Sequence, residues 1–494
     1  MVKMAAPASA GYSNDRFIGP FYPRPQLNRE SYSYNGENGF SVTRNDPLST
    51  FSIDVDTASY SNIRRFIQTG QLPPVGAVRI EEMINYFSYD YPEPQSGPFS
   101  ISTELGPCPW NQENRLVRIG IKAKELDEAH LPPSNLVFLI DISGSMNHAN
   151  KLPLLKKSMQ MLIETMTGKD RISIVVYAGS DRIVLRPTSG DKKDLIKKAI
   201  RMLASGGSTH GSGGIQTAYD LARQSFMPGG NNRIILASDG DFNVGITSRG
   251  ELERFIAEKK ESGIYLTVLG FGTGNLHDDT MEVLADRGNG NYAYIDSLLE
   301  AKKVLVKERA STLFTLADDV KLQIEFNPAR VGSYRLLGYE NRALADEDFN
   351  NDKKDSGEIG VGHTVTALYE IVPAGLQSIP RIDPLKYQKV TKKEHHPDEI
   401  LTVKLRYKPR GSKDSLLLSH SLADNHGPQK TTSTDFRFAT AVAGYGLLLK
   451  HSEHGGKMSY SDLITLAGSA RGKDNNGYRA EFVQLLELSE IISR

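Results

Sequence analysis

LVFLIDISGSM at residues 136–146 decides the fold, because five apolar residues run directly into a cluster of polar ones. A short, continuous apolar run is typical of a strand that is buried on both faces of a sheet. The strand expected at Arg233–Ala237 continues in the same way into SDGD at residues 238–241. Two buried strands that end in carboxylates and hydroxyls predict an open α/β sheet with a polar site at one edge.

Further apolar strands and amphipathic helices alternate around these two strands over residues 134–310. Strands are expected at 172–177, 264–270 and 292–295. Helices are expected at 152–166, 192–203, 214–223, 249–260, 279–286 and 298–309. This alternation predicts a Rossmann-like domain whose central, mostly parallel sheet is covered by helices on both faces.

The segments outside this domain have other patterns, so we expect a multidomain α/β protein. Before the domain, the composition predicts a flexible, polar lead at 1–45, a helical unit at 46–98 and β-strands at 99–133. After it, we expect more strands at 311–430 and a helical region at 431–494. The strands before the domain, at 99–105 and 116–123, are too few to bury a sheet face alone. We therefore predict that they pair with strands of residues 320–410 in one β-sandwich, into which the α/β domain is inserted.

The composition argues against several classes of partner and of structure. The 494 residues contain 59 Lys plus Arg and 59 Asp plus Glu, which argues against nucleic acid or an anionic membrane as the main partner. No run reaches the roughly 20 apolar residues of a membrane-spanning helix. Cys108 is the only cysteine, so the chain forms no internal disulfide bond.

Three polar clusters are expected to meet at one edge of the α/β sheet. Two follow the strands described above, and the third is the glycine-rich loop GGSTHG at residues 206–211. Loops beyond the carboxyl ends of the strands of an open α/β sheet converge on one crevice. Hard oxygen donors without Cys suit Mg²⁺, or Ca²⁺ or Mn²⁺, rather than Zn²⁺. The candidate ligands are Asp141, Ser143, Ser145, Thr209 and Asp239, and the candidates around them are Ser208, His210 and Asp241.

Hydroxyl ligands are neutral, so they cancel little of the charge of the ion. A cation that keeps an exchangeable position attracts a carboxylate, which is a physical route to binding an acidic side chain of another protein. The expected partner is therefore a protein that presents a carboxylate.

The same residues resemble those of a known family. DISGS at residues 141–145 is similar to the D-x-S-x-S signature of von Willebrand factor A (vWA) domains, and Thr209 and Asp239 match the other residues of the metal-ion-dependent adhesion site (MIDAS). The resemblance implies a divalent-metal site whose open position receives an acidic group of the ligand. The sequence departs from the adhesive domains at Asp241, a second aspartate that adds charge or caps the loop.

The flanking segments resemble a bacterial YfbK-like group over roughly residues 45–494. The similar segments are PLSTFSIDVDTASY at 47–60, RIEEMINYF at 79–87, PCPW at 107–110 and GHTVTALYE at 362–370. Members are typically exported or membrane-anchored. The resemblance therefore implies a periplasmic or surface location at the cell envelope, with a signal or lipid anchor outside this sequence; a cytoplasmic location is the alternative.

Two other acidic groups have competing interpretations. Asp54 and Asp56 are candidates for a second metal site, but the preferred interpretation is that Asp56 caps the following helix. Residues 346–358 imitate the start of a calcium-binding loop, but the glycine and the final glutamate are out of place, so a solvated acidic loop is preferred.

We expect a binding protein rather than an enzyme. The glycine-rich loop lacks the Gly-Lys-Ser/Thr ending of a nucleotide-binding loop. A metal-dependent hydrolase is one alternative, and it requires Asp241 or His210 as general base. A scaffold for an AAA-type ATPase assembly machine is the other alternative.

Overall fold

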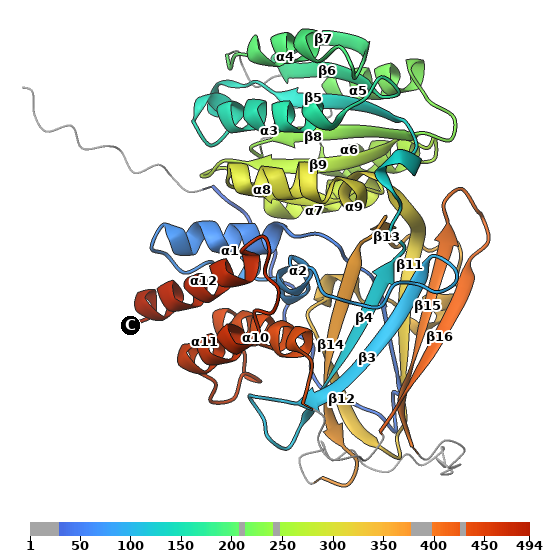
Figure 1. Ribbon diagram of the computed structural model, residues 1–494, viewed down its shortest axis with the longest axis vertical. Coiled ribbons are helices and arrows are strands. Elements are labelled where there is room, and N and C mark those ends of the chain that lie inside the picture. The colour runs from blue at the N-terminus through green and yellow to red at the C-terminus, as the bar shows by residue number, and fades with distance from the viewer. Residues whose placement is uncertain (1–28, 207–212, 241–247, 377–397, 425–430) are drawn as a thin grey trace, which may run out of the picture.

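The computed structural model describes residues 29–206, 213–240, 248–376, 398–424 and 431–494. Figure 1 shows an α/β domain at one end of the molecule and a β-sandwich at the other, with helices from both ends of the chain packed beside the sandwich. Among the helices of these described ranges, none is both long and apolar enough to cross a membrane.

The α/β domain has a six-stranded sheet in the order β10-β9-β8-β5-β6-β7. Its strands are β5 (Ser134–Asp141), β6 (Arg171–Ala178), β7 (Ser180–Ser189), β8 (Asn231–Ser238), β9 (Tyr265–Phe271) and β10 (Tyr292–Ile295). All neighbours are parallel except β7, which pairs antiparallel with β6. The predicted mostly parallel sheet is therefore confirmed.

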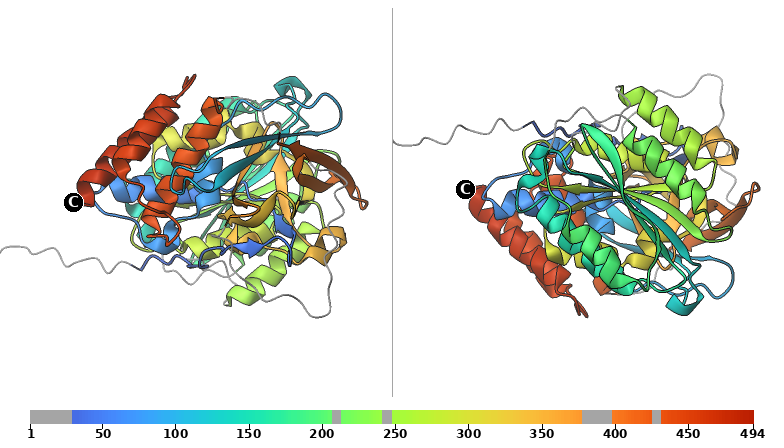
Figure 2. Two further views of the ribbon diagram at one scale, coloured as in Figure 1. Left: turned by 90° about the horizontal axis from the view of Figure 1, so that it is seen from below. Right: turned by 90° about the horizontal axis from the view of Figure 1, so that it is seen from above.

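Helices cover both faces of this sheet (Figure 2). They are α3 (Leu152–Thr165), α4 (Lys193–Arg201), α5 (Gly214–Gln224), α6 (Arg249–Lys260), α7 (Asp278–Arg287) and α8 (Leu298–Lys302), after which come a π-helix (Lys303–Lys307) and α9 (Arg309–Leu313). Successive side chains of a strand point to opposite faces. Phe138 and Ile140 of β5 accordingly pack in one core with α3, α4 and α8, whereas Val137 and Leu139 pack in another with α5, α6 and α7.

The sandwich consists of two antiparallel sheets. One sheet has the order β1-β12-β14-β4-β3; the other has the order β13-β11-β15-β16, with β2 also paired to β11. The strands are β1 (Ser41–Val42), β2 (Leu48–Ser52), β3 (Phe99–Pro107), β4 (Arg115–Ala123), β11 (Thr315–Phe326), β12 (Val331–Leu337), β13 (Gly357–Gly360), β14 (Thr364–Pro373), β15 (Glu399–Pro409) and β16 (Leu416–Ala423).

The α/β domain is inserted into this sandwich, as predicted. Strand β4 precedes the domain and pairs with β14, which follows it, from Arg115 opposite Ile371 to Lys122 opposite Thr364. Strand β2 pairs with β11 in the other sheet. The apolar faces of the two sheets form one core, in which Ile119 of β4 and Ile324 of β11 are almost completely buried.

Helices from the two ends of the chain form one layer rather than two separate parts. They are α1 (Ala58–Gln68), α2 (Ile80–Asn85), α10 (Thr434–Leu449), α11 (Tyr460–Ser469) and α12 (Tyr478–Ile492). Tyr60 of α1, Met83 of α2, Phe438 of α10 and Phe482 of α12 are buried in a shared core. Figure 2 shows these blue and red helices side by side.

The lead before the helices is extended where the structure describes it. The backbone amides of Arg29 and Ser31 donate to the carbonyls of Gly274 and Leu276 at 2.8 and 2.9 Å. Glu30 is buried in an ion pair with Arg65 of α1, at 2.8 Å. The chain then reaches the sandwich as β1, so residues 29–42 connect the α/β domain to the sandwich.

The capping interpretation of Asp56 is wrong. The residue at the N-cap of α1 is Thr57, and its side chain makes no capping hydrogen bond. Asp56 instead accepts a hydrogen bond at 2.7 Å from the backbone amide of Tyr292, on β10 of the α/β domain. The carboxylate of Asp56 therefore binds the backbone of the α/β domain and does not cap its own helix.

Candidate metal site

The candidate site lies where β5 and β8 end. Asp141 is the last residue of β5, and Asp239 directly follows β8. The two strands are parallel neighbours with Ile140 opposite Ala237, so both carboxylates lie at the same edge of the sheet. Strand order thus brings together two residues that are almost a hundred positions apart in the sequence.

Asp141 is held in place from both sides. Its Oδ1 accepts the backbone amide of Ser143 at 2.8 Å, and its Oδ2 accepts the hydroxyl of Ser238 at 3.3 Å. The side chain is 1% exposed, and burial raises the pKa of its carboxyl to about 7, with the charge of Asp239 contributing in the same direction. Ionised Asp141 is therefore costly in this place, and a cation beside it would remove the cost.

The two serines supply a pair of neutral oxygens next to this carboxylate. Oγ of Ser143 and Oγ of Ser145 are 3.0 Å apart. Neighbouring ligands of an octahedral Mg²⁺ with bonds of 2.0–2.1 Å lie about 2.9 Å apart. Ser143 is buried and Ser145 is half-buried, so the pair lies close to the molecular surface. The donor set and its spacing therefore fit a hard divalent cation.

Lys151, which immediately precedes α3, adds a positive charge that the motif does not reveal. Its ammonium group donates to Oδ2 of Asp239 at 2.7 Å and to Oδ1 of Asn275 at 2.8 Å. The lysine is 3% exposed and the aspartate 0%. This buried ion pair leaves Asp141 as the other carboxylate of the described site, so the residues around a cation would cancel only part of its charge.

Several predicted residues fall outside the described ranges. These are Thr209, Ser208, His210 and Asp241. The first residue of the glycine-rich loop, Gly206, donates its amide to the carbonyl of Ile142 at 2.9 Å, next to Asp141.

Three residues with a role at the site were missed from the sequence. Ser238 lies next to Asp239, so its place at the end of the strand was a usable signal. Lys151 and Asn275 come from a helix start and from the loop after β9, and nothing in the local pattern connects them with the site. Only the three-dimensional contacts reveal them.

Comparison with known proteins adds the family context. Residues 135–307 match the family described as von Willebrand factor type A domain, and residues 26–118 match one described as von Willebrand factor. Residues 311–492 match the family described as uncharacterized protein YfbK, C-terminal.

Whole-chain similarity is strong for one curated relative. The uncharacterized protein YfbK of Escherichia coli (strain K12) is 44% identical over 470 residues, which are 93% of this chain and 81% of that protein. Inter-alpha-trypsin inhibitor heavy chain H2 of Mus musculus is 24% identical over 282 residues, 55% of this chain and 29% of that protein. A solved structure described as von Willebrand factor type A from Catenulispora acidiphila is 15% identical and covers 79% of this chain and 91% of that chain, with a TM-score of 0.41.

Proposed function

Because the chain belongs to the YfbK family and contains a von Willebrand factor type A domain, we propose that it binds a protein partner through a divalent cation at the ends of β5 and β8. The cation is Mg²⁺, with Ca²⁺ and Mn²⁺ as the alternatives, and it is held by Asp141, Ser143, Ser145, Thr209 and Asp239. The residues that the sequence predicts around these ligands are Ser208, His210 and Asp241. The partner contributes an acidic side chain.

One observation carries this proposal: a buried carboxylate and two hydroxyls 3.0 Å apart share an edge of the sheet with an aspartate that a lysine already neutralises. Such a donor set leaves a bound divalent ion with excess positive charge. That charge supplies electrostatic attraction for a carboxylate of the partner. Asp141 and Asp239 position the ion, whereas the serine hydroxyls keep its charge exposed to the partner.

Capture of a partner from envelope and cytosolic fractions tests the proposal. Immobilised full-length protein in Mg²⁺ is expected to retain one specific protein that EDTA releases. Equal capture in Mg²⁺ and EDTA would contradict the proposal. An AAA-type ATPase in the eluate would identify the chain as part of an assembly machine. Retention from the envelope fraction would support the location that we propose, at the cell envelope.

Replacing Lys151 with methionine is expected to strengthen binding of Mg²⁺ by about tenfold or more. The substitution removes a positive charge next to the ion and frees Asp239, an electrostatic gain of at least about 1.4 kcal/mol. Without metal the same variant loses stability, because Asp239 loses its ion pair while it stays buried. Titration calorimetry measures the affinity, with Lys169→Met as a control far from the site. An unchanged or weaker affinity would show that the lysine does not oppose the ion.

A further inference from the structure

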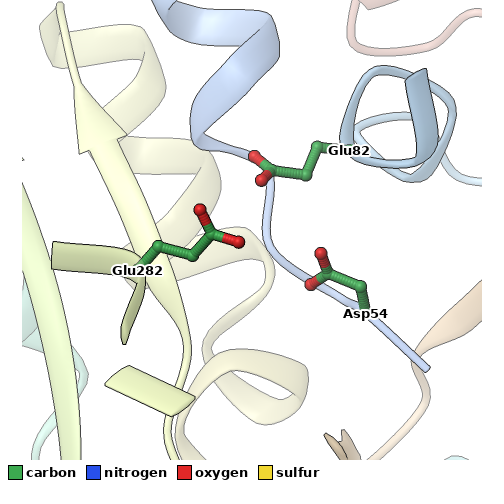
Figure 3. A group of neighbouring side chains, drawn as sticks. All are labelled: Asp54, Glu82 and Glu282. Atoms are coloured by element: carbon green, nitrogen blue, oxygen red, sulfur yellow. The ribbon is translucent and has the colours of Figure 1, made fainter. Parts of the chain in front are cut away.

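A second group of carboxylates is buried between the helical layer and the α/β domain. Asp54 follows β2, Glu82 belongs to α2, and Glu282 belongs to α7. One carboxylate oxygen from each of the three lies within 4.8 Å of the other two. Figure 3 shows the three side chains pointing toward one another from their separate elements. Their exposed fractions are 5%, 0% and 7%.

Asp56 lies beside this group and has a further, unsatisfied carboxylate oxygen. It is 3% exposed, and its Oδ2 receives no hydrogen bond from the described residues. The nearest cationic group is the guanidinium of Arg342, with Nη2 at 3.8 Å. That same guanidinium lies 3.3 Å from Asp54 and 3.4 Å from Glu282, and the charges of Asp54 and Glu82 raise the pKa of Asp56 beyond the effect of its burial, so Asp56 lies next to this group.

Positive charge in the described surroundings falls short of the negative charge. Two arginines, Arg79 and Arg342, make the ion pairs of this cluster. The carboxylates that share these two cations are Asp54, Asp56, Glu82, Asp278, Glu282 and Asp286. Buried carboxylates are strongly destabilising unless a cation or a proton neutralises them.

The pKa values of the individual carboxyl groups reflect this excess of negative charge. Burial raises the pKa of Glu282 to about 7 and raises the pKa of Glu82 and of Asp56 well above the usual range. Neighbouring carboxylates raise these pKa values further, whereas the two arginines lower them. The arginines therefore compensate only part of the charge.

We propose that Asp54, Glu82 and Glu282 hold a second divalent cation, which is Ca²⁺, and that Asp56 completes its surroundings. The ligands are oxygens from carboxylates alone, which suits a hard cation. Ca²⁺ takes six to eight oxygen ligands in flexible geometry, whereas Mg²⁺ keeps several waters and is usually bound through only one or two carboxylates. A group of three buried carboxylates therefore favours Ca²⁺.

This second ion is structural and independent of the partner-binding site. Asp54 and Glu82 belong to the N-terminal part of the chain, and Glu282 belongs to the α/β domain. A cation shared by these carboxylates joins the two parts across their interface. Its removal is expected to loosen the α/β domain from the helical layer.

Calcium uptake by the full-length protein tests this proposal. After EDTA treatment and dialysis, titration calorimetry with Ca²⁺ is made on the wild type and on Asp239→Ala, which lacks a ligand of the first site. One equivalent of Ca²⁺ is expected to bind to Asp239→Ala and to raise its Tm. Two double variants, Asp239→Ala/Glu282→Gln and Asp239→Ala/Asp54→Asn, are made for comparison. Each is expected to bind Ca²⁺ at least tenfold more weakly than Asp239→Ala.

The control is Glu370→Gln in the same background. Glu370 is a buried carboxylate that pairs with Arg335 at 2.7 Å in the sandwich, so its loss must leave Ca²⁺ uptake unchanged. Absence of Ca²⁺ uptake by folded Asp239→Ala would overturn the proposal, as would full uptake by both double variants. If the wild type bound Mg²⁺ but took up no Ca²⁺ at the second site, this inference alone would be contradicted. The proposal for the partner-binding site would be unaffected.

Discussion

Partner capture in Mg²⁺ is expected to fall to the level seen in EDTA when Asp141 or Asp239 is replaced with alanine. Each substitution removes one of the two carboxylates at the ends of β5 and β8, and each is expected to weaken Mg²⁺ binding at least about 100-fold, or about 2.7 kcal/mol. Loss of the ion removes the attraction for the acidic group of the partner. Titration calorimetry with Mg²⁺ and capture from the same extract measure the two effects.

The two variants are expected to differ in stability, so a loss of metal binding can be distinguished from a loss of folding. Asp141→Ala removes a buried carboxylate whose ionisation is already costly, so it keeps the domain folded. Asp239→Ala leaves the Lys151 ammonium buried without its counter-charge, although it still donates to Oδ1 of Asn275, at a cost of about 3–5 kcal/mol. Asp220→Ala, on the exposed side of α5, is the matched control. Wild-type capture by both site variants would refute the assignment.

Replacing Arg64 with methionine is expected to cost about 3–5 kcal/mol of unfolding free energy. Arg64 of α1 binds Asp296 at 2.6 Å and Glu300 at 2.7 Å, both in the α/β domain. It also binds Glu481 of α12 at 3.1 Å. One buried guanidinium therefore joins the start of the chain, the inserted domain and the last helix. Its loss leaves Glu300 buried and without its positive charge, and urea unfolding measures the result.

A double variant tests whether the unpaired charge of Glu300 causes the loss of stability in Arg64→Met. Arg64→Met/Glu300→Gln is expected to recover part of the stability that Arg64→Met loses, because the neutral amide is cheaper to bury. The hydroxyl of Tyr86, which donates to Glu300 at 2.7 Å, keeps an acceptor in that variant. A double variant as unstable as the sum of the two single ones would show that the residues do not act as a pair.

The sequence predicted the parts of the fold that have a clear pattern of apolar residues. The buried parallel strands of the α/β domain were identified because both of their faces are covered, which leaves a continuous apolar run. The insertion into the sandwich followed from the small number of strands before residue 124. The confirmed pairing of β4 with β14 depends on that argument.

Some edge strands were missed for the opposite reason, although the edge strands β3 and β10 were predicted. Strands β7 and β16 carry many exposed or half-buried side chains, since only part of each is covered. Their mixed polarity resembles that of loops. Strand β13 has only four residues, of which two are glycines and one is a glutamate, so it lacks the apolar run that identified the equally short β10.

Contacts between distant segments could not be predicted from local patterns. Asp56 has the sequence context of a helix cap, but it binds the backbone of Tyr292. Glu82 and Glu282 lie 200 positions apart, and each has the appearance of an ordinary polar residue on a helix. Lys151 likewise pairs with Asp239 only because α3 begins beside the end of β8.

Anomalous diffraction from crystals grown with Mn²⁺ tests the central claim most directly. We expect an anomalous peak beside Asp141, Ser143 and Ser145 at the ends of β5 and β8. A second peak between Asp54 and Glu282 would concern only the structural ion. A well-ordered crystal saturated with Mn²⁺ that shows no peak beside Asp141 would contradict the account.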